Sequence, residues 1–172
     1  APHRGGGAGT ADRAKQQFHV QDTHVVVDGA DLTGNSWFFL RSGSWTQLSG
    51  DLGLNYAAIV GRGASDGYKS TLQRLTLSGG TLTARRLCVG VANSDLHPAE
   101  VFVTGGEYIP TLPNDSAWTA AITVGQRAAK GETVWDGSLN ASVTMNNEWA
   151  SGRFEMTGGT VKTASLLLGH FA

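Results

Sequence analysis

Acidic residues at repeated positions are the first candidates for chemistry in this sequence. Asp28 and Asp136 each precede a glycine, and Asp31 and Asp51 follow comparable glycines in successive segments. Paired carboxylates could cleave a glycosidic bond, and stacked carboxylates could bind calcium. Asp28 and Asp136 occupy a place that Ser or Thr fills elsewhere, which favours side chains that bond to a turn. Asp31 and Asp51 alone fall short of the roughly six to eight oxygen ligands of calcium, so neither a catalytic residue nor a metal site is predicted.

Histidine and cysteine add no further catalytic or metal site. Cys88 is the one cysteine and lies in an apolar run, which predicts a small buried side chain. The sequence has no G-x-S-x-G motif, and Gly5 to Gly7 lack the Lys-Ser/Thr of a phosphate-binding loop. We therefore expect no enzyme activity and no cofactor. The histidines, which share no metal-ligand spacing, are His3, His19, His24, His97 and His170.

Tryptophan is the remaining candidate for ligand contact. The chain has five tryptophans, and aromatic rings can stack on sugar rings or anchor a protein interface. Packing of loops against the body of the fold would also account for them. The residues predicted to contact a glycan or another partner are Trp37, Trp118, Trp135 and Trp149.

The elements that must carry these residues are set by an internal repeat. A turn of the form Thr/Ser-Gly-Gly recurs at Ser78–Gly80, Thr104–Gly106 and Thr157–Gly159, and each copy is followed by an apolar run that ends on glycine or a polar turn. Looser copies are centred on Gly29, Gly50 and Gly137. Regular repetition of such a turn along the chain indicates a solenoid, and the six copies of the turn predict about six coils.

The repeated segments are expected to be strands. They are apolar over three to five residues and are bounded by glycine, and 24 glycines would disfavour helices. An antiparallel sandwich also has short strands and glycine turns, but it does not repeat its turn residues in register. The fold class is therefore predicted to be all-β, a parallel β-helix. The expected core residues are Leu77, Val89, Val103, Val124, Met156 and Leu168.

The two ends of the chain differ. Residues 1–22 are expected to form a flexible arm with a short capping helix over Thr10 to Phe18, and residues 23–172 the solenoid. The C-terminal segment stops in mid-repeat, strongly apolar and without a cap. An uncapped coil can pair with another chain. The predicted subunit interface is Leu166, Leu167, Leu168 and Phe171.

Charge and hydropathy argue against a nucleic-acid partner and against a membrane-spanning helix. The net charge of −1 and the lack of a Lys/Arg run argue against nucleic acid as a partner. No stretch of about 20 apolar residues is present, so no membrane-spanning helix is predicted. The chain begins with alanine and lacks a signal peptide, which fits a mature secreted form as well as an excised fragment.

The turn T-G-G-x-[VL], followed by a short aliphatic strand that ends in glycine, resembles the repeats of bacterial secreted β-solenoid proteins. These are the autotransporter-associated strand-repeat proteins, built on the pectate-lyase-like right-handed parallel β-helix. The resemblance covers roughly Ser49 to Ala172. It implies a right-handed coil and an extracellular or cell-surface location. It leaves the activity open, because this scaffold carries filaments, adhesins, tailspikes and polysaccharide lyases alike.

Three functions follow as expectations. The first is a non-catalytic structural role, as a subunit or segment of an extracellular filament or surface layer made by end-to-end stacking and self-association. The second is an adhesin or glycan-binding module that uses the tryptophan-bearing loops and surface glycans. The third is a fragment of a polysaccharide lyase or hydrolase, for which the sequence offers no catalytic set.

Overall fold

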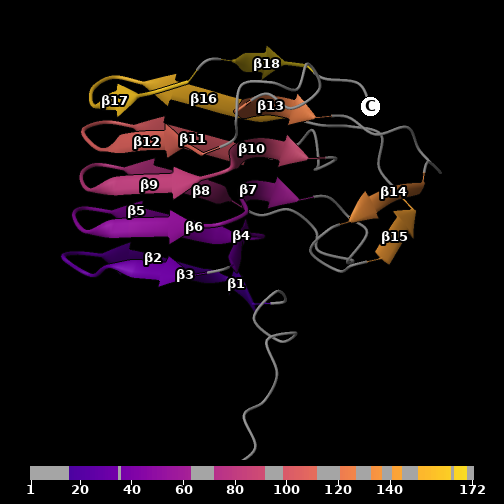
Figure 1. The fold of residues 1–172 in the computed structure, drawn as a ribbon, viewed down its shortest axis with the longest axis horizontal. Helices are drawn as coiled ribbons and strands as arrows, with labels where there is room; N and C mark the ends of the chain where they lie inside the picture. The colour runs from indigo at the N-terminus through magenta and orange to yellow at the C-terminus, as the bar shows by residue number, and fades with distance from the viewer. Residues whose placement is uncertain are drawn as a thin grey trace, which may run out of the picture.

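Three sheets of parallel strands wind around one axis and form a stacked coil (Figure 1). The structure is a computed structural model, and it describes residues 16–34, 36–62, 72–91, 99–111, 121–126, 133–136, 141–144, 151–163 and 165–169. Every pairing within the three sheets is parallel, and strands of one sheet recur at every third position in the chain, apart from an inserted hairpin. The predicted parallel β-helix is therefore confirmed.

The three sheets are named A, B and C in the order in which the chain visits them. Sheet A consists of β1 (Gln16–Val20), β4 (Ser36–Leu40), β7 (Ala57–Arg62), β10 (Arg86–Val91), β13 (Ile122–Gln126) and β18 (Leu166–Leu168). Sheet B consists of β2 (Thr23–Val27), β5 (Gly43–Gln47), β8 (Gln73–Leu77), β11 (Ala99–Val103) and β16 (Gly152–Met156). Sheet C consists of β3 (Leu32–Gly34), β6 (Asp51–Leu54), β9 (Thr81–Ala84), β12 (Glu107–Pro110) and β17 (Thr160–Val161).

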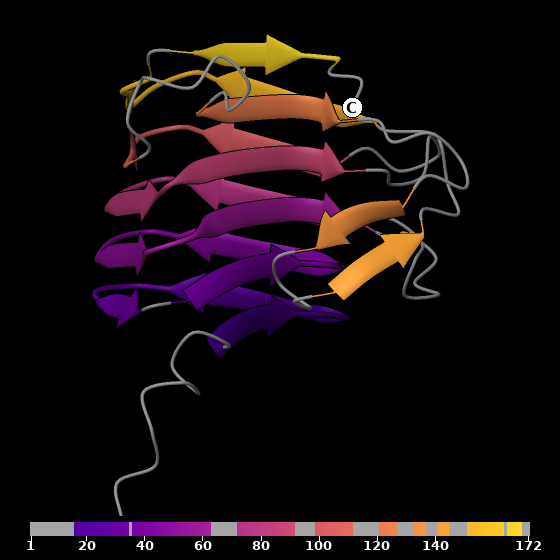
Figure 2. The ribbon, with the colours of Figure 1, turned by 45° about the vertical axis from the view of Figure 1, so that its right-hand side comes forward.

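The stack contains about five coils rather than six. The chain runs from left to right along sheets C and A on the near side of the stack and back along sheet B on the far side (Figures 1 and 2). It moves up by one layer with each such turn, which makes the coil right-handed. The sequence pattern predicted one coil too many, because the segment around Gly137 does not form a coil of the stack. Its flanking segments are β14 (Thr133–Asp136) and β15 (Ala141–Thr144), which pair antiparallel as a hairpin inserted between β13 and β16. This hairpin lies beside the stack and adds no layer to it (Figure 2).

The start of the stack also differs from the prediction. The expected capping helix over Thr10 to Phe18 is contradicted at Gln16 to Phe18, because these residues belong to β1. Strand β1 pairs in parallel with β4, from Gln16 with Ser36 to Val20 with Leu40. The solenoid therefore includes Gln16 to Val20, which the prediction had placed before its start at Thr23. Residues 1–15, which include most of the predicted arm, lie outside the described residues.

The Thr/Ser-Gly-Gly turns form the corner between sheets B and C. In each coil the backbone of this corner bonds to the corner below, for example Ser78 N to Gln47 O at 2.9 Å and Thr104 N to Leu77 O at 2.9 Å. Any residue larger than glycine would disrupt these hydrogen bonds between coils, because a Cβ on Gly79 would lie 2.0 Å from the carbonyl oxygen of Leu48. The repeated glycine therefore allows the close approach of one coil to the next.

Alternate residues of each strand point inward and stack in columns that form the core. One such column of sheet A runs through Phe38, Ala58, Leu87 and Ile122, all of which are buried. The predicted core residues Leu77, Val89, Val103 and Val124 are buried as expected. Met156 and Leu168 are exposed, which contradicts the prediction. They continue the inward columns, but they belong to the last described strands of sheets B and A, so no strand in the described part of the chain covers them.

Three long connections between strands begin at two corners of the stack. The segments between Val91 and Ala99 and between Gln126 and Thr133 follow strands of sheet A, whereas the segment between Ile109 and Ala120 follows a strand of sheet C. Most of their residues lie outside the described part of the chain.

Candidate functional site

The acidic residues singled out by the sequence bond between coils. The Ser49 hydroxyl donates to the Asp28 carboxylate at 2.6 Å, and the backbone N–H of Asp51 donates to the Asp31 carboxylate at 3.0 Å. Asp31 and Asp51 therefore lie side by side in successive coils, but the Asp31 carboxylate is engaged with backbone. The side chain of Asp136 lies outside the described part. Within that part, three or more metal-ligating side chains do not come together anywhere.

The histidines that the structure describes belong to the first coil. His24 Nδ1 lies 2.8 Å from the Ser44 hydroxyl oxygen, and the His19 ring stacks on Phe39 with centroids 5.2 Å apart. Both contacts join the first coil to the second. His3, His97 and His170 lie outside the described residues.

Cys88 is buried, as its apolar surroundings predict. Burial raises the pKa of its thiol above the usual value. The Thr123 hydroxyl and the Arg86 charge lower this pKa, but by less than burial raises it. A thiol that keeps its proton is a poor nucleophile. Cys88 is therefore a packing residue of sheet A.

Of the four predicted contact tryptophans, the structure describes one side chain. Trp37 is half-buried on the outer side of β4, whereas Trp118, Trp149 and the side chain of Trp135 lie outside the described part. The Trp37 ring lies between those of Phe39 and Tyr56, with centroid distances of 6.0 and 5.3 Å and interplanar angles of 11° and 5°. Tyr56 therefore ends a row of stacked rings that begins at His19.

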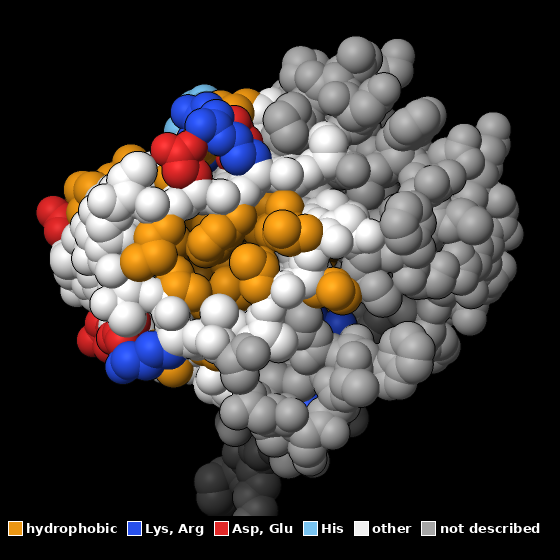
Figure 3. Space-filling view, turned by 90° about the horizontal axis from the view of Figure 1, so that it is seen from above, with side chains coloured by type: hydrophobic (Ala, Val, Ile, Leu, Met, Phe, Trp, Pro, Cys, Tyr) orange, Lys and Arg blue, Asp and Glu red, His pale blue; other side chains and the backbone are white. Residues whose placement is uncertain are grey.

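The first candidate site is the C-terminal end of the stack. The inward columns of sheets A and B come to the surface there as Leu166, Leu168 and Met156, which are 51%, 67% and 47% exposed. Seen from above, apolar side chains fill the middle of this face and the charged side chains lie at its margin (Figure 3). Charged side chains of the last strands of sheets B and C form two ion pairs, Arg153 with Glu155 and Lys162 with Glu107. The face therefore has an apolar centre and a polar rim, as protein interfaces have.

The predicted interface residues have different places at this end. Leu166 and Leu168 lie in the inward columns above Ile122 and Val124, whereas Leu167 is paired with Thr123 and points outward. Phe171 lies outside the described residues. Of the described strands, six belong to sheet A and five each to sheets B and C, and β18 is the last of them, so it forms a ledge of one strand spacing, about 4.8 Å. A partner that covers this end must therefore fit a step.

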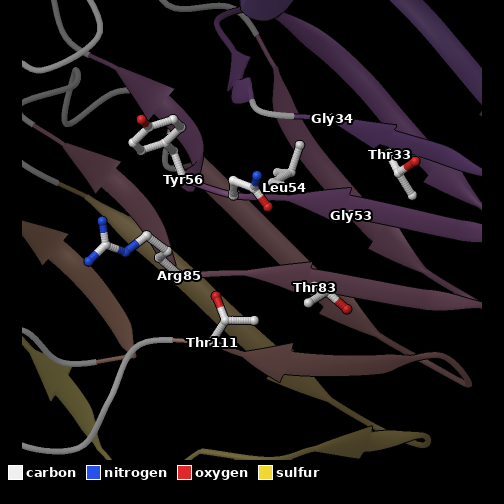
Figure 4. A pocket seen from close by; sticks show the side chains of 9 residues that line it. Thr33, Gly34, Gly53, Leu54, Tyr56, Thr83, Arg85 and Thr111 are labelled. Carbon is white, nitrogen blue, oxygen red and sulfur yellow. The ribbon is translucent and has the colours of Figure 1, made fainter. Parts of the chain in front are cut away.

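The second candidate site is a lateral groove on sheet C. Its volume is about 710 Å³, and its walls come from the first four coils (Figure 4). Parallel coils lie about 4.8 Å apart, so the groove extends over roughly 14 Å along the stack. The lining residues are Thr33, Gly34, Gly53, Leu54, Asn55, Tyr56, Thr83, Arg85 and Thr111.

Backbone bonds at the corner between sheets C and A hold the groove residues in place. Asn55 N donates to Gly34 O at 3.3 Å, Arg85 N to Tyr56 O at 2.9 Å, and Thr111 N to Ala84 O at 2.8 Å. Tyr56 and Arg85 are thereby brought together from successive coils, as Figure 4 shows. The sequence points to Arg85 only as half of the basic pair Arg85–Arg86, and it gives no sign of Tyr56.

Arg85 is the charged residue among the described residues that line the groove. Its side chain is exposed, and it forms no ion pair, hydrogen bond or ring contact with the described residues. The arginines of sheet B differ, since Arg74 and Arg153 both lie near the Glu100 carboxylate. Among the described residues, the groove thus presents a cation without a counterion, together with threonine hydroxyls.

Comparison with known proteins assigns no relative: no protein-family model matches the chain, and neither a curated protein nor a solved structure shows significant similarity. Among the described residues, no helix is long and apolar enough to cross a membrane.

Proposed function

We propose that this chain is a subunit or segment of an extracellular filament or surface layer, assembled by end-to-end stacking of solenoids. The observation that supports the proposal is the exposure of Leu166 and Leu168 at the C-terminal end. In the preceding strand the same two columns hold Ile122 and Val124, which are buried. Two columns that are closed to water along the stack are thus open at this end.

A second copy of the chain suits this face for two reasons. Exposed apolar side chains gain free energy when another apolar surface covers them, about 25 cal/mol for each Å² removed from water. The backbone edge of β18 with which no described strand pairs can also add a strand. The opposite end of the stack also exposes an apolar side chain. Phe18 is 41% exposed there, and it lies next to Phe38 in the column that ends at Leu166.

The extracellular location rests on the resemblance of the Thr-Gly-Gly repeats to secreted bacterial solenoids. The parallel coil agrees with that resemblance at the level of architecture. We therefore place the protein outside the cell as part of the same proposal, and secretion of the full-length gene product into the medium or onto the cell surface would test it.

Electron microscopy of the purified protein tests the assembly. The proposal expects regular fibres, and it expects Leu168→Asp to abolish them, because an unpaired carboxylate buried in an apolar junction costs several kcal/mol. The matched control is Val26→Asp, since Val26 is 64% exposed and Leu168 67%, but Val26 points outward from β2. Discrete particles from the unmodified protein, or fibres from Leu168→Asp as abundant as those from Val26→Asp, would contradict the stacking.

A second function, binding of a surface glycan by an adhesin-like module, is favoured by the groove on sheet C. The row of rings that ends at Tyr56 gives this groove a fixed aromatic wall. Of the predicted contact residues, Trp37 supports this function, because it holds the Tyr56 ring in place. Reduced binding of a glycan array after Trp37→Ala would be the expected result, and an unchanged binding profile would speak against it.

A further inference from the structure

The groove on sheet C is lined by a positive charge as well as by the aromatic ring of Tyr56. Among the described residues, the lining contains the Arg85 guanidinium and no carboxylate. The acidic residues Asp31 and Asp51 lie before or at the start of the strands of sheet C, whereas Tyr56 and Arg85 follow the ends of these strands. A ligand in the groove therefore meets a positive charge, and none of the described lining residues places a negative charge beside it.

The remaining lining is suited to a ligand rich in hydroxyl groups. Thr33, Thr83 and Thr111 bring side-chain hydroxyls from three different coils. A hydroxyl both donates and accepts hydrogen bonds, so these side chains match a ligand whose polar groups do the same. Glycine at positions 34 and 53 keeps the floor low and leaves backbone accessible.

The Tyr56 ring supplies an apolar surface for the other side of such a ligand. Trp37 covers one face of the ring at a centroid distance of 5.3 Å, and no ring of the described residues lies against the other face. A pyranose ring has a face of C–H groups that packs against an aromatic ring, while its hydroxyls remain available at its edge.

We propose that this groove binds an extended saccharide that carries carboxylate groups, with a carboxylate on Arg85 and a sugar ring against Tyr56. The inference rests on the second function above, glycan binding, and adds the charge of the glycan. A guanidinium binds a carboxylate through two parallel hydrogen bonds, which a neutral hydroxymethyl group cannot replace. The groove length of roughly 14 Å favours a chain of several sugars over a single one.

Isothermal titration calorimetry with a matched pair of ligands tests the proposal. The pair is a tetramer of β-1,4-linked glucuronic acid and cellotetraose, which differ at C6 of each sugar. We expect the acidic tetramer to bind at least about tenfold more tightly to the unmodified protein. Arg85→Gln should remove this preference, and it should leave the fold intact because the side chain is exposed.

Lys162→Gln is the control for a general loss of positive charge. Lys162 is also exposed and directly follows β17 of sheet C, but it pairs with Glu107 and does not line the groove. Its substitution should leave both affinities unchanged. An equal loss in Arg85→Gln and Lys162→Gln would show attraction to the overall charge and would overturn the site.

The remaining outcomes separate the inference from the function on which it rests. Equal binding of the two tetramers, unaffected by Arg85→Gln, would overturn the charge preference and leave glycan binding standing. Binding of neither tetramer would overturn the groove as a saccharide site and the second function with it. Neither result bears on filament assembly, which involves the end of the stack.

Discussion

Gly80 lies directly above Gly50, and a Cβ on Gly80 would lie 2.0 Å from the Gly50 carbonyl oxygen. Gly80 also has a φ of 67°, a conformation that side chains rarely adopt. The same oxygen accepts a hydrogen bond from Thr81 N at 3.0 Å, so the backbone has little room to move away. The spacing of the coils at this corner therefore depends on glycine.

The first prediction is that Gly80→Ala destabilises the fold by about 3 kcal/mol or more. Strain at positive φ contributes roughly 1–2 kcal/mol, and the collision with the neighbouring coil adds to it. Gly169→Ala is the control, because Gly169 has a similar φ of 64° but nothing within 4 Å of its added Cβ. Urea denaturation should show a loss of about 1 kcal/mol for the control. Equal losses in the two variants would mean that the contact between coils is unimportant.

The repeat of this corner is what made the fold predictable from the sequence. Ser78–Gly80 and Thr104–Gly106 are stacked in register, and each corner bonds to the coil below at the equivalent residue, Ser78 N to Gln47 O and Thr104 N to Leu77 O. The error at Gly137 arose because Asp-Gly after an apolar residue is also typical of a β-hairpin. The local pattern cannot distinguish the two, and the antiparallel pairing of β14 with β15 decides it.

The start of the stack and the groove could not be predicted from the sequence, for different reasons. Gln16 to Phe18 tolerate helix and strand alike, and pairing with β4 overrides their local preference. The groove depends on register: Asn55 and Tyr56 fill a corner that Arg85 alone fills in the next coil. Such a one-residue difference becomes visible only when the coils are aligned in space.

The second prediction concerns Glu100, which joins three strands of sheet B. Its carboxylate accepts hydrogen bonds from Arg74 Nε at 2.8 Å and Nη2 at 2.6 Å, and it lies 3.9 Å from Arg153 Nη1. Both guanidinium groups also lie 5.2 Å from the centre of the Phe102 ring. Glu100→Gln should cost about 1–3 kcal/mol, because it leaves two neighbouring arginines without their shared anion.

Salt provides the control for this effect. The cost of Glu100→Gln should shrink at about 1 M NaCl, since salt screens the repulsion between Arg74 and Arg153. Glu155→Gln should change the free energy of unfolding by less than about 0.5 kcal/mol, because its pair with Arg153 is exposed. A Glu100→Gln variant as stable as the unmodified protein in low salt would contradict the assignment.

The third prediction is that Cys88 is inert in the folded protein. Burial raises the pKa of its thiol, so little thiolate forms near pH 8, and reagents have no access to it. A disulfide-exchange reagent such as dithiobis(nitrobenzoate) should release no colour from the native protein within minutes. It should release one equivalent in strong denaturant. Rapid reaction without denaturant would place the thiol at the surface.

The last prediction is a loss of stability at alkaline pH. Burial raises the pKa of Tyr108 above its ordinary value of 10.0, with a smaller effect of Cys88 in the same direction, and burial likewise raises the pKa of Cys88 above 9.0. The unfolded chain therefore releases both protons at a pH where the native state retains them. The free energy of unfolding should fall above about pH 9, by up to roughly 1.4 kcal/mol per pH unit for each group.

Tyr108→Phe isolates the tyrosine contribution to this loss. The Tyr108 hydroxyl donates to the Ala121 carbonyl oxygen at 3.0 Å, so the variant should lose about 1 kcal/mol at pH 7. Above pH 10 its stability should decline less steeply than that of the unmodified protein, because one of the two groups that titrate differently in the two states is gone. Urea denaturation from pH 7 to 11 measures both effects. Parallel curves for the two proteins would show that Tyr108 titrates alike in the folded and unfolded chains, and would contradict its burial.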